Sequence, residues 1–301
     1  MSDRVTVFEV GPRDGLQNES RPVSLANKLW LVSRLLKAGV RECELGAFVR
    51  PDRIPQMADT EEVFAAIRAK KLKLGDAHVW SLVPNMRGLE RAAAAGAKRI
   101  AVFTAATDGF ARKNIGMSVD ESLAEFGVVI AEAHRQGMTV RGYVSTAFGC
   151  PYEGKVAPRK PLRVIARLLE LGVSQVSVGD TIGIAHPRAV DAVIGPAFKD
   201  YGVKRLAVHF HDTRGTALAN TLRSLEIGVR TIDSSAGGLG GCPYAPGATG
   251  NLATEDLVFM LNGMGLKSGI DLEILCKTSF EFSRRIGRPI SSRYLQAWAA
   301  S

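Results

Sequence analysis

Short apolar runs alternate with longer amphipathic stretches along almost the whole chain. The apolar, β-branched runs predict eight strands, at Val5–Val10, Glu42–Ala47, His78–Val83, Arg99–Thr104, Thr139–Thr146, Gln175–Val178, Leu206–His211 and Thr231–Ser234. Amphipathic stretches after the first seven predict helices at Leu25–Ala38, Thr60–Lys70, Met86–Ala95, Ser118–Gln136, Pro161–Leu171, Pro187–Tyr201 and Thr216–Ile227. Several of them end in a glycine just before the next strand, which is typical of helix ends.

This alternation indicates a parallel sheet with helices outside it, and eight units predict a closed (β/α)8 TIM barrel. A doubly wound open sheet is the alternative, although it usually has fewer strands. Without a break in composition, residues 1–301 are predicted to form one catalytic domain. Residues 237–301 of that domain would supply a glycine-rich, cysteine-bearing loop and a C-terminal extension with two helices from about Glu255.

Length and composition are those of a globular protein. A chain of 301 residues with 46% hydrophobic residues can bury one large core. No apolar run reaches the length of a membrane span, and the first strand begins too early to leave room for a signal peptide. We therefore expect a cytoplasmic protein with no membrane partner.

The formal charge of +9 does not predict nucleic-acid binding, because Lys and Arg are scattered among acidic residues and no basic run alternates with aromatic ones. The positive charge suits an anionic small substrate instead. The four cysteines show no CxxC spacing and are interpreted as free thiols.

Unusual polar residues gather where the predicted strands end. In a barrel of this type the active site lies at the C-terminal ends of the strands, so these residues would converge. His209 and His211 are two positions apart at a strand end and so face the same way. The other candidates are Arg13, Asp14 and Gln17 after the first strand, Glu44 in the second, Arg141 and Tyr143 in the fifth, Ser177, Asp180 and Thr181 in or after the sixth, and Cys242 and Asn251 after the eighth.

Asp14, His209 and His211 supply one carboxylate and two imidazoles, to which Asn251 would add a carbonyl oxygen. Such a mixed set favours Mg²⁺ or Mn²⁺, with zinc left open. In the simpler interpretation, Asp14 caps a turn and Asn251 only occupies its loop. Arg13 would either pair with Asp14 or stabilise negative charge on a substrate.

Seven segments resemble the 3-hydroxy-3-methylglutaryl-CoA lyase family. They are Phe8–Glu19, Arg141–Ser145, Gly149–Gly154, Gly179–Gly183, Val208–Thr213, Gly238–Ala245 and Thr254–Asp256. The resemblance covers nearly the whole chain in order. The condensing enzymes of isopropylmalate and homocitrate synthesis share the barrel and the His-x-His pair but lack this cysteine loop, so the lyase branch is favoured.

The resemblance implies divalent-metal-dependent cleavage of (S)-3-hydroxy-3-methylglutaryl-CoA, an acyl-CoA, to acetyl-CoA and acetoacetate, a reaction of leucine catabolism and ketone-body metabolism. It also implies a homodimer or a larger homo-oligomer. Asp14, His209, His211 and Asn251 would hold the metal, and Arg13 would stabilise an enolate. His209 and Cys242 would move protons, and Glu44 would support Arg13. The expected substrate-binding residues are Arg13, Gln17, Arg141, Tyr143, Ser177 and Asp180.

One segment departs from the family pattern. After Glu44 the family usually has a small residue, then Gly or Thr, then Ser and Phe. Here the run is Leu45, Gly46, Ala47 and Phe48, and Arg50 stands where a serine is usual. Losing a serine hydroxyl would remove a hydrogen bond to the acyl group worth ~1 kcal/mol, and Leu45 would add bulk. A longer-chain 3-hydroxy-3-acylglutaryl-CoA or citramalyl-CoA is therefore an alternative substrate. A catalytically silent barrel is the alternative from another class.

Overall fold

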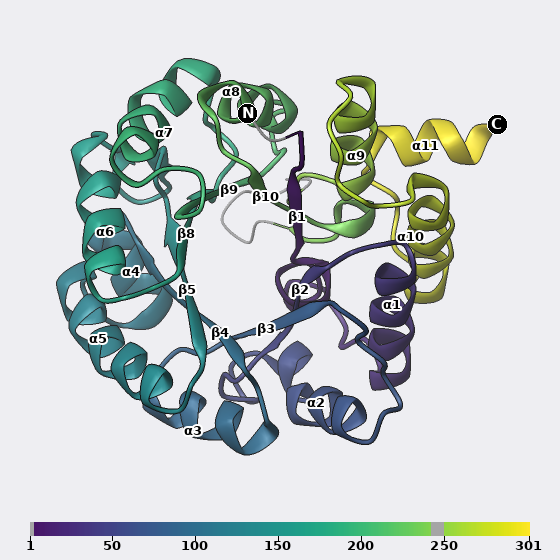
Figure 1. The fold of residues 1–301 in the computed structure, drawn as a ribbon, viewed down its shortest axis with the longest axis horizontal. Coiled ribbons are helices and arrows are strands. Elements are labelled where there is room, and N and C mark those ends of the chain that lie inside the picture. Colours follow the sequence, from purple (N-terminus) through teal and green to yellow (C-terminus); the bar gives the residue numbers. More distant parts are fainter. Residues whose placement is uncertain (1–2, 242–249) are drawn as a thin grey trace.

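The predicted strands close into a parallel barrel in the computed structural model, which describes residues 3–241 and 250–301. Around the barrel the order is β1-β10-β9-β8-β5-β4-β3-β2 (Figure 1). The strand bounds are β1 Thr6–Glu9, β2 Glu42–Ala47, β3 His78–Leu82, β4 Arg99–Ala105, β5 Thr139–Ser145, β8 Gln175–Asp180, β9 Leu206–Phe210 and β10 Thr231–Ser234. This order confirms the predicted (β/α)8 barrel and excludes the doubly wound open sheet.

All seven predicted helices are present and surround the barrel. Their bounds are α1 Leu25–Lys37, α2 Thr60–Arg68, α3 Met86–Ala95, α5 Val119–Arg135, α6 Arg159–Glu170, α7 Pro187–Tyr201 and α8 Ala217–Ile227. The start of α5 shows why the sequence sets these bounds: the Ser118 hydroxyl accepts from the Glu121 backbone, and the Glu121 carboxylate accepts from the Ser118 backbone. This capping box satisfies two amides that the helix leaves unpaired.

The C-terminal region differs from the prediction. It contains three helices, α9 Thr254–Gly263, α10 Leu272–Ile286 and α11 Arg293–Ala300, where two were expected. The first follows β10 and completes the eighth strand-helix unit, so only α10 and α11 extend the barrel. Helix α10 packs against α1, while α11 lies at the outer edge of the molecule (Figure 1). Glycines with positive φ at Gly265 and Gly287 separate the three helices.

The described residues also form elements that were not predicted, among them a helix and a hairpin. Helix α4, Asp108–Ile115, lies between β4 and α5, and a small hairpin joins β6 (Gly149–Cys150) to β7 (Gly154–Lys155) after β5. Helix α4 is short and mostly polar, with only Phe110 and Ala111 buried, so it lacks the broad apolar face that reveals a helix in sequence.

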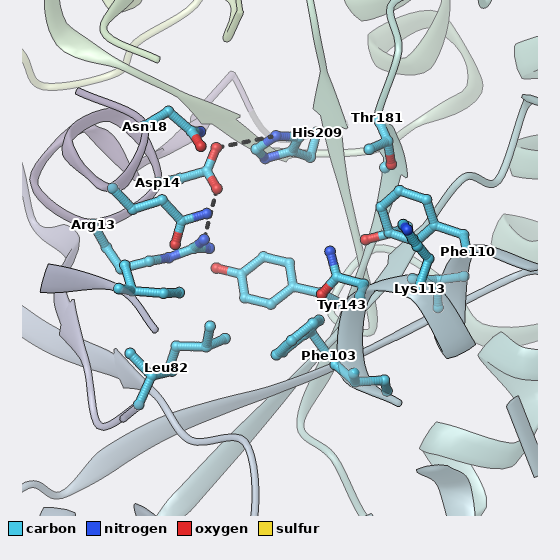
Figure 2. A pocket seen from close by; sticks show the side chains of 18 of the residues that line it. Arg13, Asp14, Asn18, Leu82, Phe103, Phe110, Lys113, Tyr143, Thr181 and His209 are labelled. Atoms are coloured by element: carbon cyan, nitrogen blue, oxygen red, sulfur yellow. Dashed lines mark hydrogen bonds and ion pairs between the residues drawn. The ribbon is translucent and has the colours of Figure 1, made fainter. Parts of the chain in front are cut away.

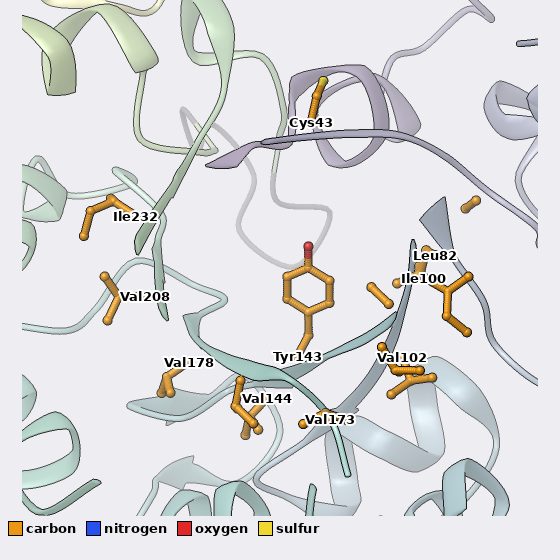
Figure 3. Packing of buried hydrophobic residues seen from close by; sticks show 14 of the residues in the cluster. Cys43, Leu82, Ile100, Val102, Tyr143, Val144, Val173, Val178, Val208 and Ile232 are labelled. Carbon is orange, nitrogen blue, oxygen red and sulfur yellow. The ribbon is translucent and has the colours of Figure 1, made fainter. Parts of the chain in front are cut away.

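The barrel wall separates an apolar layer from a polar interior. Side chains alternate along each strand, so one set packs against the helices and the other faces the barrel axis. Val144, Val178, Val208 and Ile232 point away from the axis, whereas Tyr143 projects inward (Figure 3). The inward layer also contains Arg141 and Asp233, which meet across the barrel. Among the described residues no helix has the length and apolar character of a membrane span.

Candidate active site

The first catalytic candidates lie on a single π-helical turn. This turn, η1, spans Gly11–Gly15 directly after β1, and such turns are frequent at functional sites. It carries Arg13 and Asp14 into the mouth of the barrel. The Arg13 Nε donates to Glu44 Oε2 at 2.7 Å, and its Nη1 donates to Asp14 Oδ1 at 2.6 Å. Arg13 is therefore fixed between two carboxylates.

Burial and these ion pairs together determine the pKa values of all three groups. Burial opposes the charged form of Arg13, but Glu44 and Asp14 outweigh it and raise the Arg13 pKa. Burial would likewise raise the pKa of Asp14, yet Arg13 and the two imidazoles lower it to about 2. For Glu44 burial prevails over Arg13, and its pKa is raised. Asp14 is thus a carboxylate throughout the neutral pH range.

Asp14 meets two histidines from β9 and its end. Ligand atoms of Asp14, His209 and His211 all lie within 4.8 Å of one another, and the two imidazole centroids are 5.2 Å apart. Burial, and next the neighbouring His209, lower the pKa of His211 to about 4. Its imidazole is therefore neutral at neutral pH, which is the form that binds a metal.

Asn251 completes this cluster. An isolated β-bridge pairs its backbone with that of His211, and its Nδ2 donates to Asp14 Oδ2 at 2.9 Å and to the Leu239 carbonyl at 3.1 Å. The carboxamide oxygen of Asn251 is buried and has no hydrogen-bond partner within the described part of the chain. A buried oxygen without a donor is unfavourable unless it meets a cation or another ligand, so the donor set fits a divalent ion.

A cavity of about 840 Å³ opens over this cluster. Of the predicted residues, the lining includes Arg13, Asp14, Gln17, Tyr143, Ser177, Thr181, His209 and His211. The Tyr143 hydroxyl points toward Arg13, while Lys113 and Phe110 lie on the opposite side (Figure 2). Sequence reasoning missed the other lining residues, among them Asn18, Arg53, Leu82, Phe103, Phe110, Arg112, Lys113 and Asn114. Four of these belong to α4, which the hydrophobic pattern did not reveal.

Three predicted residues lie elsewhere. Arg141 is fully buried outside the cavity lining, and the Asp180 carboxylate accepts from the backbone amides of Ile184 and Ala185. A substrate in the cavity is therefore not expected to contact Arg141 or Asp180. Glu44 is buried too, where it accepts from Arg13 and from the Tyr143 hydroxyl at 3.1 Å, as a supporting residue would. Cys242 lies outside the described residues.

The departure after Glu44 does not reach the cavity. Leu45 belongs to the hydrophobic core, and the backbone of Ala47 bonds to the Thr60 hydroxyl; neither residue lines the cavity. Arg50 is exposed and pairs with Asp52 at 2.6 Å. The expectation that Leu45 adds bulk beside the acyl group is therefore wrong, because its side chain faces the core.

Sequence reasoning also missed Asp233. Its carboxylate is buried beneath His209, with Oδ2 3.4 Å from His209 Nδ1. Burial would raise its pKa, but Arg141 prevails and lowers it. One signal could have revealed it: Asp233 is an acidic residue within a short, otherwise uncharged strand. A carboxylate buried in such a strand needs a buried partner.

Two buried glutamates hold the backbone beside the site: Glu9 connects η1 to the start of the glycine-rich loop, and Glu255 holds the loop start alone. Glu9 accepts from the amides of Gly11 at 2.8 Å and Ala236 at 2.9 Å, and Glu255 accepts from the amide of Gly237. Burial raises the pKa of Glu9 to about 7 and that of Glu255 to about 8. Both segments that carry site residues are therefore hydrogen-bonded to carboxyl groups whose pKa is unusually high.

The raised pKa of Glu255 predicts a pH-dependent stability. The folded protein keeps a proton that the unfolded chain releases above about pH 4.5, so stability present below that pH is lost as the pH rises to about 8. The variant Glu255→Gln has no such proton. Relative to it, the free energy of unfolding of the wild type should fall by up to about 1.4 kcal/mol for each pKa unit of the shift. Urea denaturation of both proteins across this range measures the difference, and parallel curves would contradict it.

Comparisons with known proteins agree with this geometry. The HMGL-like family model matches residues 4–280. The hydroxymethylglutaryl-CoA lyase of Pseudomonas mevalonii is 46% identical over 297 residues, covering 98% of this chain and 97% of the relative.

Two solved structures extend the likeness to the fold. The hydroxymethylglutaryl-CoA lyase from Pseudomonas aeruginosa has a TM-score of 0.95 and 43% identity, covering 100% of this chain and 99% of the other. An HMG-CoA lyase from Acinetobacter baumannii, in complex with coenzyme A and 3-methylmalate, has a TM-score of 0.93 and 36% identity over 99% of this chain and 96% of the other. The matches span the barrel and every described site residue, and the chain belongs to the HMGL-like family.

Proposed function

We propose that this protein is a hydroxymethylglutaryl-CoA lyase that uses Mg²⁺ or Mn²⁺ to cleave (S)-3-hydroxy-3-methylglutaryl-CoA into acetyl-CoA and acetoacetate. The observation that carries the proposal is the cluster of Asp14, His209 and His211 beside Arg13 at the barrel mouth. It supplies a cation site and a fixed positive charge in one cavity. The 46% identity to a hydroxymethylglutaryl-CoA lyase, over 98% of this chain, supports the choice of substrate.

The divalent ion would be held by Asp14, His209, His211 and the carboxamide oxygen of Asn251. When bound, it would polarise the substrate oxygens next to the bond that breaks. Two imidazoles and two oxygens suit Mn²⁺ and Mg²⁺ without forming the closed thiolate set of a structural zinc site.

The chain's own residues would then move a proton and stabilise charge. The 3-hydroxyl gives its proton to Nε2 of His209, and the electrons of that O–H bond form the ketone of acetoacetate. One lone pair cannot bind an ion and a proton at once, so Asp14, His211 and Asn251 would hold the ion while His209 carries the proton. The C2–C3 bond breaks, and its electron pair moves onto the thioester carbonyl as an enolate. Arg13 stabilises the enolate oxygen, because its guanidinium is held in place before the charge develops. Protonation of the enolate carbon yields acetyl-CoA.

Cys242 is proposed to deliver that last proton. It follows Gly241 in the sequence, and Gly241 lines the cavity. A thiol at this position would serve as the acid for a carbanion.

The basic residues around the cavity support an acyl-CoA substrate. Arg53, Arg112 and Lys113 line it, and all three residues are exposed. Coenzyme A carries a diphosphate and a further phosphate, which such cations attract. A solved relative bound to coenzyme A supports the same substrate class.

The alternatives have less support. A bulkier acyl group is not favoured, because Leu45 and Ala47 lie away from the cavity. A silent barrel would have no need for the Asp14, His209 and His211 cluster. The cytoplasmic location and the homodimer stay predictions.

Activity and metal removal test the proposal together. With Mg²⁺ or Mn²⁺, the purified protein should release acetyl-CoA and acetoacetate in equal amounts from the methylglutaryl ester. Treatment with a chelator should abolish the release, and either ion should restore it. A folded, metal-loaded protein that releases neither product would overturn the proposal, and a clear preference for a longer-chain ester in kcat/KM would change the substrate.

A further inference from the structure

Asp233 occupies a rigid position inside the barrel. The Arg141 guanidinium contacts both of its oxygens, with Nη2 2.6 Å from Oδ1 and Nη1 3.1 Å from Oδ2, and the Ser177 hydroxyl donates to Oδ2 at 2.9 Å. Asp233 and Arg141 are both almost inaccessible to solvent. A bidentate pair of this kind fixes the plane of the carboxylate as well as its position.

The imidazole of His209 lies between this carboxylate and the metal cluster. Its Nδ1 is buried, has no hydrogen-bond partner within the described part of the chain and lies 3.4 Å from Asp233 Oδ2, while its Nε2 is 4.0 Å from Asp14 Oδ2. One ring nitrogen therefore faces the buried ion pair, and the other faces the cavity. Which nitrogen of a neutral imidazole carries the proton is determined by the partner of the other nitrogen.

We propose that Asp233 is the positioning residue of His209: its carboxylate accepts the Nδ1–H and so directs the free Nε2 lone pair toward Asp14. The inference rests on the proposed function in one respect, because the proposed function is what assigns metal binding and proton transfer to that lone pair. An outer carboxylate that orients a metal-binding histidine commonly affects metal affinity as strongly as a ligand does.

The same geometry gives Arg141 a role other than substrate binding. Its guanidinium lies 3.9 Å from the Phe8 ring centroid, and its Nη1 also donates to the Tyr143 hydroxyl at 2.9 Å. The Tyr143 hydroxyl in turn donates to Glu44, the partner of Arg13. Arg141 thus holds Asp233 on one side and Tyr143 on the other, and one buried network orients both His209 and Arg13.

The variant Asp233→Asn tests the inference because it keeps the shape of the side chain. The Oδ2 position receives donors from Arg141 and Ser177 and faces His209, and an amide offers only one oxygen to these partners. With Oδ1 held by Arg141, the amide nitrogen faces His209 and donates to Nδ1. The proton of His209 should therefore move to Nε2.

The first readout is the tautomer itself. In metal-free protein labelled with ¹⁵N-histidine, at a pH where the imidazoles are neutral, long-range ¹⁵N–¹H spectra should show the Nδ1–H form in the wild type. The Asn variant should show the Nε2–H form. The signals missing from a His209→Gln sample identify His209.

The second readout is metal affinity. Calorimetric titration with Mn²⁺ should show binding about 10–100-fold weaker in Asp233→Asn, with kcat lowered by a similar factor and KM little changed. The matched control is Gln175→Leu, which removes a hydrogen bond to Arg141 from the same network without touching Asp233 or His209. It should bind Mn²⁺ within about twofold of the wild type.

An unchanged tautomer together with unchanged Mn²⁺ affinity in Asp233→Asn would overturn the inference. If this variant does not fold, the double variant Asp233→Leu/Arg141→Met removes both buried charges and leaves Nδ1 of His209 without an acceptor at this position. It should show the same loss of the Nδ1–H form and of Mn²⁺ affinity. Lyase activity of the wild type is measured in parallel. An inactive wild type that shows the expected tautomers refutes the proposed function alone, and an active wild type with no tautomer change in the variant refutes this inference alone.

Discussion

Replacing Arg13 with methionine is expected to lower kcat for cleavage of the methylglutaryl ester by about 10²–10³-fold, the usual cost of losing one fixed donor to a developing oxyanion. KM should change less, because the enolate charge exists only in the transition state and beyond. Steady-state kinetics with saturating Mg²⁺ measure both constants. The structure adds a stability cost: Glu44 and Asp14 lose their common partner, and breaking a buried pair costs about 3–5 kcal/mol.

Arg13→Lys is the matched control for this prediction. It keeps the charge but replaces the planar fork that reaches Glu44 and Asp14 with a single ammonium, so it should retain part of the rate. A Met variant that folds and turns over within about tenfold of the wild type would show that Arg13 only stabilises the fold.

Replacing His209 with alanine should lower kcat by about 10²–10⁴-fold even with saturating metal, because the variant loses its proton acceptor together with a metal ligand. The fold should tolerate the change, since Arg141 still neutralises Asp233. Kinetics at increasing Mn²⁺ concentrations separate the two losses: added metal restores occupancy and leaves the missing proton acceptor unchanged.

His211→Ala serves as the comparison. His211 is a proposed ligand without a proposed role in proton transfer, so its loss should weaken Mn²⁺ binding to a similar extent while excess metal recovers much of the rate. Equal recovery in both variants would refute the assignment of His209 as the proton acceptor.

The sequence predicted the barrel well because each of its units carries its own periodic signal. Strands that are buried on both faces, such as β9, appear as apolar runs, and the polar residues that interrupt them mark the site. His209 and Asp14 could be brought together from the general rule for barrel mouths alone.

Pairings across the barrel could not be predicted in the same way. Periodicity shows that Arg141 faces inward, but its partner Asp233 lies on β10, which is not a neighbour of β5 in the sheet. An inward arginine was therefore interpreted as a substrate contact. Helix α4 was missed for a different reason, because its short apolar face gives too weak a pattern.

The connection through Glu9 has a consequence for protein engineering. A single carboxylate holds both η1 and the start of the glycine-rich loop, and a Cβ at Gly11 would lie 2.5 Å from its Oε1. The two segments are therefore one structural module, although more than two hundred residues separate them in the chain. A loop transplanted from a relative would need a matching Glu9 and Gly11 in its new host to reach the same position.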